Sequence, residues 1–186
     1  MQHSFCASYN NVTVRQIQEK DLELLREWRN NSSNSRYLNP IPYITREMQL
    51  KWYKDYLNDD TILTFGIVET ELFNRLVGSV SIYDYSGGQS DCGKTMIGDA
   101  EARGHNLGFW GEVIALHIGF QKLGIKQYIT DVHEDNFASQ KMTARLGFQK
   151  IGKHPFVNGG FLDDFEMSYE RFYSVHPYLL DVSISE

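Results

Sequence analysis

The sequence predicts a mixed α/β (α+β) fold: a largely antiparallel twisted sheet, about four flanking helices and one central β-α-β unit. Two observations favour it. Runs rich in β-branched and aromatic residues at 61–69 and 75–85 are separated by a polar turn, which is typical of an antiparallel hairpin. Strand-like runs at 94–99 and 126–133 enclose a long apolar helix expected over 108–123.

The elements before this unit follow from local signals. Residues 11–17 alternate and predict a strand, and 19–30 predict a helix. The polar and proline-rich segment 30–43 predicts a loop. A second helix is expected over 45–59, with Thr45 as its N-cap and an apolar stripe of Met48, Trp52 and Tyr56.

The elements around and after the unit are assigned in the same way. The glycine-containing segment 86–93 predicts a flexible loop. A short helix is expected to open on Asn136 and close on Gly147. Two strands should follow, joined at Asn158-Gly159, a strong signal for a hairpin turn.

Length and charge restrict the class of protein. At 186 residues we expect a single domain over 1–186, with a core of about 12–172 and a C-terminal extension over 174–186. The net charge of −6, without a basic run, argues against a nucleic-acid partner. No segment resembles a signal peptide or approaches the ~18 apolar residues of a membrane span, so we expect a cytoplasmic protein without a membrane partner.

Cysteine and histidine spacing and the C-terminal extension give three further expectations. Cys6 and Cys92 lack CxxC spacing and the six histidines form no metal-like pair, so no disulfide framework and no metal is expected. In the extension, Leu180, Val182 and Ile184 alternate with polar residues, the pattern of a half-buried strand. That strand would add to a sheet edge, within a monomer or across a homodimer.

The segment from Arg103 to Gly108, "RGHNLG", precedes the long apolar helix. A helix N-terminus carries free backbone N–H groups and about half a positive charge. A loop with few side chains lets a phosphate approach those donors, so the five amides from Gly104 to Gly108 are candidates to wrap a pyrophosphate. The alternative is a loop whose glycines only make a turn.

This segment resembles the R/Q-x-x-G-x-G/A loop of the GNAT superfamily of N-acetyltransferases. "NFASQKMTARLGF" is similar to that family's Asn-containing helix, and "VNGGFLDDFEMS" and "LREWRNN" resemble the last hairpin and first helix of its RimJ/RimL-like subgroup. The resemblance covers roughly residues 12–172. It implies acetyl-CoA as the acetyl donor, with its pyrophosphate on the loop, formed by Arg103, Gly104, His105, Asn106, Leu107 and Gly108.

The resemblance also implies where the pantetheine arm of acetyl-CoA lies. In the family this arm pairs like a strand with the strand before the loop, which places it on Met96, Ile97 and Gly98. Asn136 touches the same arm or an ordered water. One position departs from the family pattern: Asn106 stands where glycine is usual. Asn tolerates a positive φ, so the loop can keep its shape, but the side chain would crowd the pyrophosphate.

Acetyl transfer to an amine needs an acid for the thiolate, a base for the amine and an oxyanion donor. The family often has a tyrosine acid seven residues after the helix-opening Asn, where this chain has Thr143. The RimL-like pattern instead selects Ser139, together with Asn136, as the catalytic pair. The base stays open between four groups: Asp84, Asp91, Glu101 and His133. An acyl-cysteine route through Cys92 is disfavoured.

Acceptor-binding side chains are expected from the first helix, the following loop and the last hairpin. The candidates are Trp28, Arg29, Arg36, Tyr37 and Tyr43. The acceptor is the primary amine of a small molecule, a nucleotide-linked amino sugar among them, or a protein N-terminus. The alternative to an enzyme is a non-catalytic acyl-CoA-binding module.

Overall fold

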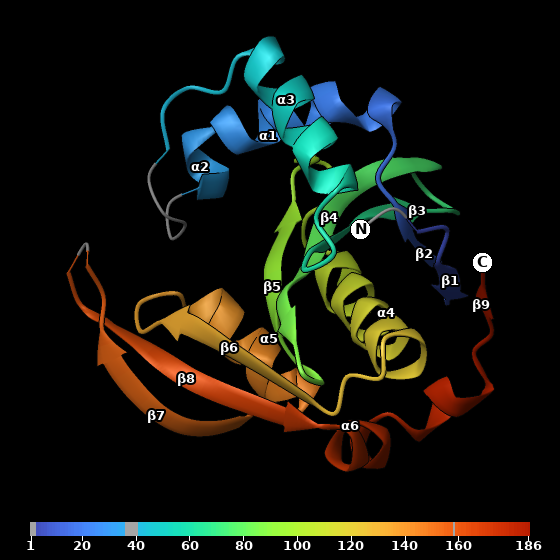
Figure 1. Ribbon diagram of the computed structural model, residues 1–186, viewed down its shortest axis with the longest axis vertical. Helices are drawn as coiled ribbons and strands as arrows, with labels where there is room; N and C mark the ends of the chain where they lie inside the picture. Colours follow the sequence, from blue (N-terminus) through green and yellow to red (C-terminus); the bar gives the residue numbers. More distant parts are fainter. Residues whose placement is uncertain (1–2, 36–40, 158) are drawn as a thin grey trace.

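The computed structural model describes residues 3–35, 41–157 and 159–186. Its centre is one nine-stranded sheet in the order β7-β8-β6-β5-β4-β3-β2-β1-β9 (Figure 1). Among the described strands, β5 and β6 run parallel and the other neighbours run antiparallel. The strands are β1 Cys6–Tyr9, β2 Val12–Gln16, β3 Leu63–Glu69, β4 Arg75–Ser86, β5 Gln89–Ile97, β6 Gln127–His133, β7 Gln149–Pro155, β8 Phe161–Ser168 and β9 Ile184–Ser185.

Six α-helices flank the sheet in the described part of the chain, against about four expected. They are α1 Leu22–Asn30, α2 Ser32–Ser35, α3 Arg46–Leu57, α4 Leu107–Lys122, α5 Phe137–Leu146 and α6 Tyr169–Val175. Two 3-10 turns, η1 Glu19–Asp21 and η2 Pro177–Asp181, complete the list. The two extra helices are the short α2 and α6. The predicted fold class is confirmed, including the central β5-α4-β6 unit.

Helix α4 forms the main core because it is apolar on all sides. Its residues from Gly111 to Phe120 are all buried, and the cluster around it includes Phe65 and Ile67 of β3. Gly119 allows the helix to approach the sheet, since a Cβ there would collide with the Tyr128 hydroxyl of β6. The rigid α4 therefore fixes the strands that lead into and out of it.

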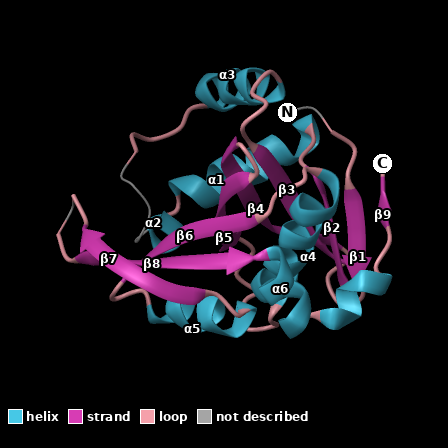
Figure 2. Ribbon diagram, turned by 60° about the horizontal axis from the view of Figure 1, so that its bottom comes forward, coloured by secondary structure: helices cyan, strands magenta, loops and turns pink. Residues whose placement is uncertain are grey.

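A second, smaller core covers the other face of the sheet. Ile17, Leu22, Leu25 and Tyr56 pack together there, from η1, α1 and α3 and their flanks. The Tyr56 hydroxyl lies 3.3 Å from both the backbone N and the backbone O of Thr64 in β3. Helices α1 and α3 thus lie at one end of the molecule, and α5 and α6 lie at the other in both views (Figures 1 and 2).

The second predicted helix is correct in position and correct only in part in its buried face. Thr45 caps it as expected, its side chain accepting from the Met48 N–H at 3.2 Å. Met48 and Trp52 of the expected stripe are exposed, whereas Gln49 and Tyr56 are buried. Tyr56 of the expected stripe is thus confirmed as buried, whereas the stripe is wrong at Met48 and Trp52, because the helix lies at the surface and apolarity alone does not fix which of its sides is covered.

Two predicted loops are wrong in part. Segment 86–93 is not a flexible loop: β4 and β5 continue almost to its tip, and Gly87 and Gly88, at φ of 58° and 87°, make a two-residue hairpin turn. Segment 30–43 contains α2 at Ser32–Ser35. Its residues 36–40, including the acceptor candidates Arg36 and Tyr37, lie outside the described residues.

The C-terminal half matches its prediction closely. α5 opens on Asn136 and ends at Gly147, which takes the left-handed conformation at φ 96°. β7 and β8 form the expected antiparallel hairpin, although Asn158 of its turn lies outside the described residues. In the extension, Ile184 of β9 pairs with Ala7 of β1, so the tail adds to the sheet edge of its own chain. Leu180 lies in η2 instead.

No helix that the structure describes is long and apolar enough to cross a membrane.

Candidate active site

The two parallel strands at the centre of the sheet separate halfway along their length. β5 pairs with β6 only at Gln89, Ser90 and Asp91. Two side-chain bonds follow, from Thr130 Oγ1 to the Cys92 carbonyl at 3.0 Å and from Cys92 Sγ to the Ile129 carbonyl at 3.9 Å. β5 then runs on to Ile97 paired only with β4 among the described strands. The β5 backbone beyond Cys92 therefore offers an open edge to an extended ligand.

Met96 and Ile97, two of the residues expected to contact the pantetheine arm, lie on this open edge, and the third, Gly98, directly follows β5. Met96 and Ile97 are half-buried and pair with Ser79 and Gly78 of β4. Gly98 is buried beneath the indole ring of Trp28, which occupies the place a Cβ would take. Trp28, an expected acceptor-side residue, thus closes the end of the edge from α1.

The loop that follows takes the shape that anion binding needs. Gly104 has φ 85°, and Asn106 has φ 60° as the N-cap of α4, so Asn106 keeps the backbone conformation expected for a glycine. Within the described part of the chain, no hydrogen bond is donated by the amides from Gly104 to Phe109. Trp110 is the first to donate, to the Asn106 carbonyl at 3.2 Å. These free amides are the donors a pyrophosphate requires.

The loop side chains turn away from these amides. Arg103 donates from Nε to the Ile97 carbonyl at 3.2 Å and also bonds Asn34 of α2. His105 stacks edge-on against Phe73 at 5.4 Å. Leu107 is buried in the main core, whereas Gly108 lies half-buried near Ile97. The side chains of Arg103, His105 and Leu107 therefore have partners outside the row of free amides.

Asn136 and Ser139 lie at the start of α5, directly after β6. The Asn136 side chain accepts from the Ser139 backbone N–H at 3.3 Å, so it works as a helix cap whatever else it does. Both residues are half-buried. Thr143, at the family's tyrosine position, is 4% exposed. Ser139 is the more accessible hydroxyl of the two.

The four groups proposed as the base differ in their exposure and in their hydrogen-bond partners. Glu101 is exposed and bound to Arg75 at 2.5 Å, and Asp84 is exposed. His133 lies 3.2 Å from the Gly159 carbonyl through Nε2, and its Nδ1 accepts from Asp135. Asp91 is half-buried at the last paired position of β5, where the two strands part.

The surroundings of Asp91 suit a base. Burial, and then the negative charges of Asp131 and Asp84, raise the pKa of Asp91 to about 6. The ammonium group of Lys94 lies 3.5 Å from the ring centre of Tyr83 beside it. The carboxyl is therefore largely ionised at neutral pH and still basic enough to take a proton.

Two other groups bear on the chemistry. Burial raises the pKa of the Cys92 thiol well above its usual value, which leaves it a poor nucleophile. Glu112 of α4 was not anticipated: it is buried, accepts from the Thr95 hydroxyl at 2.7 Å, and burial raises its pKa to about 7. The sequence signal was present, because Glu112 is the one acid in α4.

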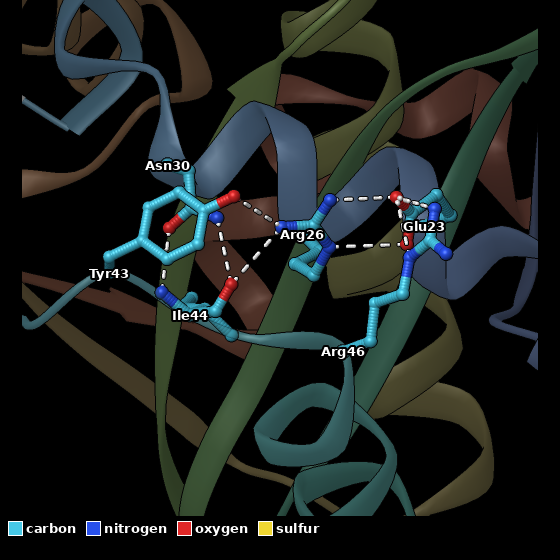
Figure 3. A network of polar contacts seen from close by, with 6 residues as sticks. All are labelled: Glu23, Arg26, Asn30, Tyr43, Ile44 and Arg46. Carbon is cyan, nitrogen blue, oxygen red and sulfur yellow. Dashed lines mark hydrogen bonds and ion pairs between the residues drawn. The ribbon is translucent and has the colours of Figure 1, made fainter.

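A polar network fixes the entry to α3 beside the proposed acceptor side (Figure 3). Arg26 donates to the Tyr43 hydroxyl at 3.0 Å and to the Ile44 carbonyl at 3.1 Å. Asn30 and Ile44 exchange a pair of hydrogen bonds at 2.9 and 3.0 Å. The Tyr43 hydroxyl is thus already engaged. The members are Glu23, Arg26, Asn30, Tyr43, Ile44 and Arg46.

No group of three or more potential metal ligands occurs among residues 3–35, 41–157 and 159–186. Cys6 and Cys92 are both free thiols.

Comparison with known proteins identifies related chains. The family model described as an acetyltransferase (GNAT) domain matches residues 11–149. No curated protein matches the sequence. Among solved structures, spermidine N-acetyltransferase from Vibrio cholerae, in complex with CoA and spermine, has a TM-score of 0.79 at 18% identity, covering 87% of this chain and 98% of that one.

Two further structures show the same fold. Apo FdhC, a nucleotide-linked sugar GNAT, has a TM-score of 0.77 at 17% identity and covers 97% of this chain and 98% of its own. Ribosomal-protein-S5-alanine acetyltransferase from Vibrio fischeri has a TM-score of 0.71 at 15% identity, with coverages of 90% and 98%.

Proposed function

The chain belongs to the GNAT family of acetyltransferases, and on this premise we propose that residues 1–186 form one cytoplasmic, acetyl-CoA-dependent N-acetyltransferase domain. The observation that carries the proposal has two parts. β5 and β6 part after Asp91, and β5 then leads into a loop whose amides from Gly104 to Phe109 donate no hydrogen bond within the described part of the chain. The open edge at Met96, Ile97 and Gly98 would hold the pantetheine arm. Arg103 to Gly108 would hold the pyrophosphate, chiefly through their backbone.

Acetyl-CoA supplies the activated acetyl thioester. Asp91 takes the proton from the amine, directly or through a water, as the new carbon–nitrogen bond forms and the carbon–sulfur bond breaks. Ser139 hydrogen-bonds the departing sulfur, which leaves as the thiolate and takes a proton from water, while Asp91 returns to water the proton that it took from the amine. Asn136 holds the first turn of α5 in place for Ser139. Holding both reactants in line supplies much of the rate.

The acceptor is a primary amine of a small molecule, a nucleotide-linked amino sugar among them, or a protein N-terminus. Membership of the RimJ/RimL-like subgroup would favour the N-terminus. The structural neighbours named above act on different amines and are under 25% identical to this chain. We therefore treat the acceptor as the variable of the experiment.

The experiment measures thiol release from acetyl-CoA over a panel of amines, with product mass as confirmation. The panel holds amino sugars, nucleotide-linked amino sugars, short peptides and a polyamine. The polyamine is included because the negative charges of Asp84, Asp91 and Asp131 interact with one another and together would attract a polycation. We expect N-acetylated product from at least one class. Binding of acetyl-CoA without thiol release from any amine would instead identify a non-catalytic acyl-CoA-binding module.

A second measurement tests Asp91 as the base. The wild-type kcat/KM should rise with pH through about 6 as the carboxyl ionises. Asp91→Asn should lose this limb and about 10²-fold in rate. Asp84→Asn is the matched control: it removes a like charge, lowers the pKa of Asp91 and should move the limb to lower pH while activity is kept. An active Asp91→Asn variant with the wild-type profile would remove Asp91 from this role.

A further inference from the structure

Two arginines flank the loop that the proposed function assigns to the pyrophosphate, and the structure gives them different partners. Arg103 begins the loop, and Arg145 lies in the last turn of α5. Arg103 belongs to the loop motif Arg103–Gly108 that resembles the family's pyrophosphate loop, whereas Arg145 lies outside this loop.

The charge of Arg103 is directed toward α2 and the sheet. Its guanidinium bonds the Ile97 carbonyl at 3.2 Å and the side chain of Asn34. Asn34 in turn donates to the Trp28 carbonyl at 3.0 Å. Arg103 therefore joins the cofactor loop to α1 and α2, and two of its three donor nitrogens, Nε and Nη2, are already in use on that side.

The charge of Arg145 is held at the first turn of α4. Its Nη1 donates to Asn106 Oδ1 at 3.0 Å, and its guanidinium carbon lies 3.7 Å from the ring centre of Phe109. Asn106 is the N-cap of the helix and Phe109 is its third residue. Arg145 is exposed, and no carboxylate of the described chain forms an ion pair with it.

This placement is electrostatically unusual. A helix N-terminus carries partial positive charge and normally attracts acids, so a fixed cation beside it is unfavourable until an anion arrives. An anion on the free amides would interact favourably with both the helix end and the guanidinium. The contacts with Asn106 and Phe109 keep the cation in place before the anion binds, which reduces the entropy lost on binding.

We propose that Arg145 is the side-chain cation of the pyrophosphate site of coenzyme A, and that Asn106 tethers it there. The inference rests on the proposed function. It also explains the departure from glycine at 106: Asn keeps the left-handed backbone, and its Oδ1 gives Arg145 an acceptor. The Asn106 side chain, expected to crowd the phosphates, is instead drawn toward α5.

The test is calorimetric titration of coenzyme A into three proteins at two salt concentrations. Arg145→Met should bind about tenfold more weakly at low salt, as expected for a lost charged contact. Its affinity should also depend less on salt than that of the wild type. Lys54→Met, the matched control, removes an exposed cation of α3 that has no part in the proposed site, and its affinity should stay within about twofold of the wild type. Wild-type affinity in Arg145→Met, or an equal loss in Lys54→Met, overturns the proposal.

Two further measurements separate the tether from the charge. Asn106→Gly should weaken binding by about threefold, because Arg145 loses its acceptor, and adding Arg145→Met should restore none of that loss. If instead Asn106→Gly restores the affinity of Arg145→Met, Arg145 only steers the Asn106 side chain and the proposal is wrong.

Dephospho-coenzyme A identifies which phosphate is involved. It lacks the 3′-phosphate but keeps the pyrophosphate, so Arg145→Met should weaken its binding by the same factor as that of coenzyme A. A loss confined to coenzyme A would assign Arg145 to the 3′-phosphate and overturn the pyrophosphate assignment. Wild-type protein that binds neither compound would contradict the proposed function itself, not the role of Arg145 alone. Because Arg145 is exposed, the variants should remain folded, as circular dichroism will report.

Discussion

At the scale of single residues, Glu112 couples the stability of the fold to pH. Burial raises its pKa from 4.5 to about 7, so between these values the folded chain holds a proton that the unfolded chain has lost. Stability should therefore fall as pH rises through this window, by up to about 3 kcal/mol. Glu112→Gln keeps an acceptor for Thr95 and should lose less. Denaturation at pH 5 and pH 8 measures this, and identical losses in both proteins would contradict it.

Ser139 and Thr143 allow the leaving-group role to be assigned by substitution. Ser139→Ala should lower kcat with little change in acetyl-CoA affinity, because a contact made only in the transition state affects turnover. A serine hydroxyl is a poor acid, so we expect about 10²-fold or less. Thr143→Ala should change kcat little, since Thr143 is buried in α5. Steady-state kinetics with the reverse ranking would move the role to Thr143.

Residue types predict backbone conformation better than they predict which side chains make contact. The positive φ of Asn106 and the capping by Asn136 were both expected, because each follows from the conformational preference of asparagine at one position. The partners of Asn106 and Glu112 come from elements far apart in the chain. No local pattern specifies such pairs, so the contact of Arg145 with Asn106 and that of Thr95 with Glu112 became evident only in the folded molecule.

At the scale of elements, the C-terminal strand should stabilise the sheet edge. β9 pairs with β1, the buried His117 lies 3.2 Å from the Val182 carbonyl, and Lys122 pairs with Glu186 at 2.6 Å. Deleting residues 182–186 should cost about 1–3 kcal/mol, because His117 loses an acceptor. Glu186→Gln, which removes only an exposed ion pair, should cost under about 1 kcal/mol. An unchanged melting temperature in the deletion would show that the tail contributes nothing.

Element boundaries were predictable where a cap or a turn marks them. Thr45, Asn136 and Gly147 each end or begin a helix where expected. The buried face of α3 was predictable only in part, because apolarity alone does not fix which side of this surface helix is covered, and Trp52 is exposed. The true length of β5 was also missed, since a flexible loop and a Gly-Gly hairpin turn share the same composition.

At the scale of the whole molecule, the order of elements was enough to predict the fold class. An apolar helix between two strands, with hairpins on both sides, leaves few ways to build one sheet. The parting of β5 and β6 was not predictable from pattern. Beyond Asp91, β5 stays paired with β4 and β6 stays paired with β8, and no local pattern encodes these long-range pairings.

Binding of acetyl-CoA should stabilise the whole fold by mass action. At a concentration one hundred times the Kd, the gain is about 2.7 kcal/mol, or about 5–10 °C for a chain of this size. Gly108→Pro removes one of the free amides and should abolish this shift, although proline is sterically tolerated in the first turn of a helix. Gly108→Ala is the matched control. A Cβ there makes only ordinary contacts, 3.6 Å from Thr95 and Ile97, and the amide is kept. Thermal denaturation with and without acetyl-CoA compares the three proteins, and a normal shift in Gly108→Pro would place the phosphate site elsewhere.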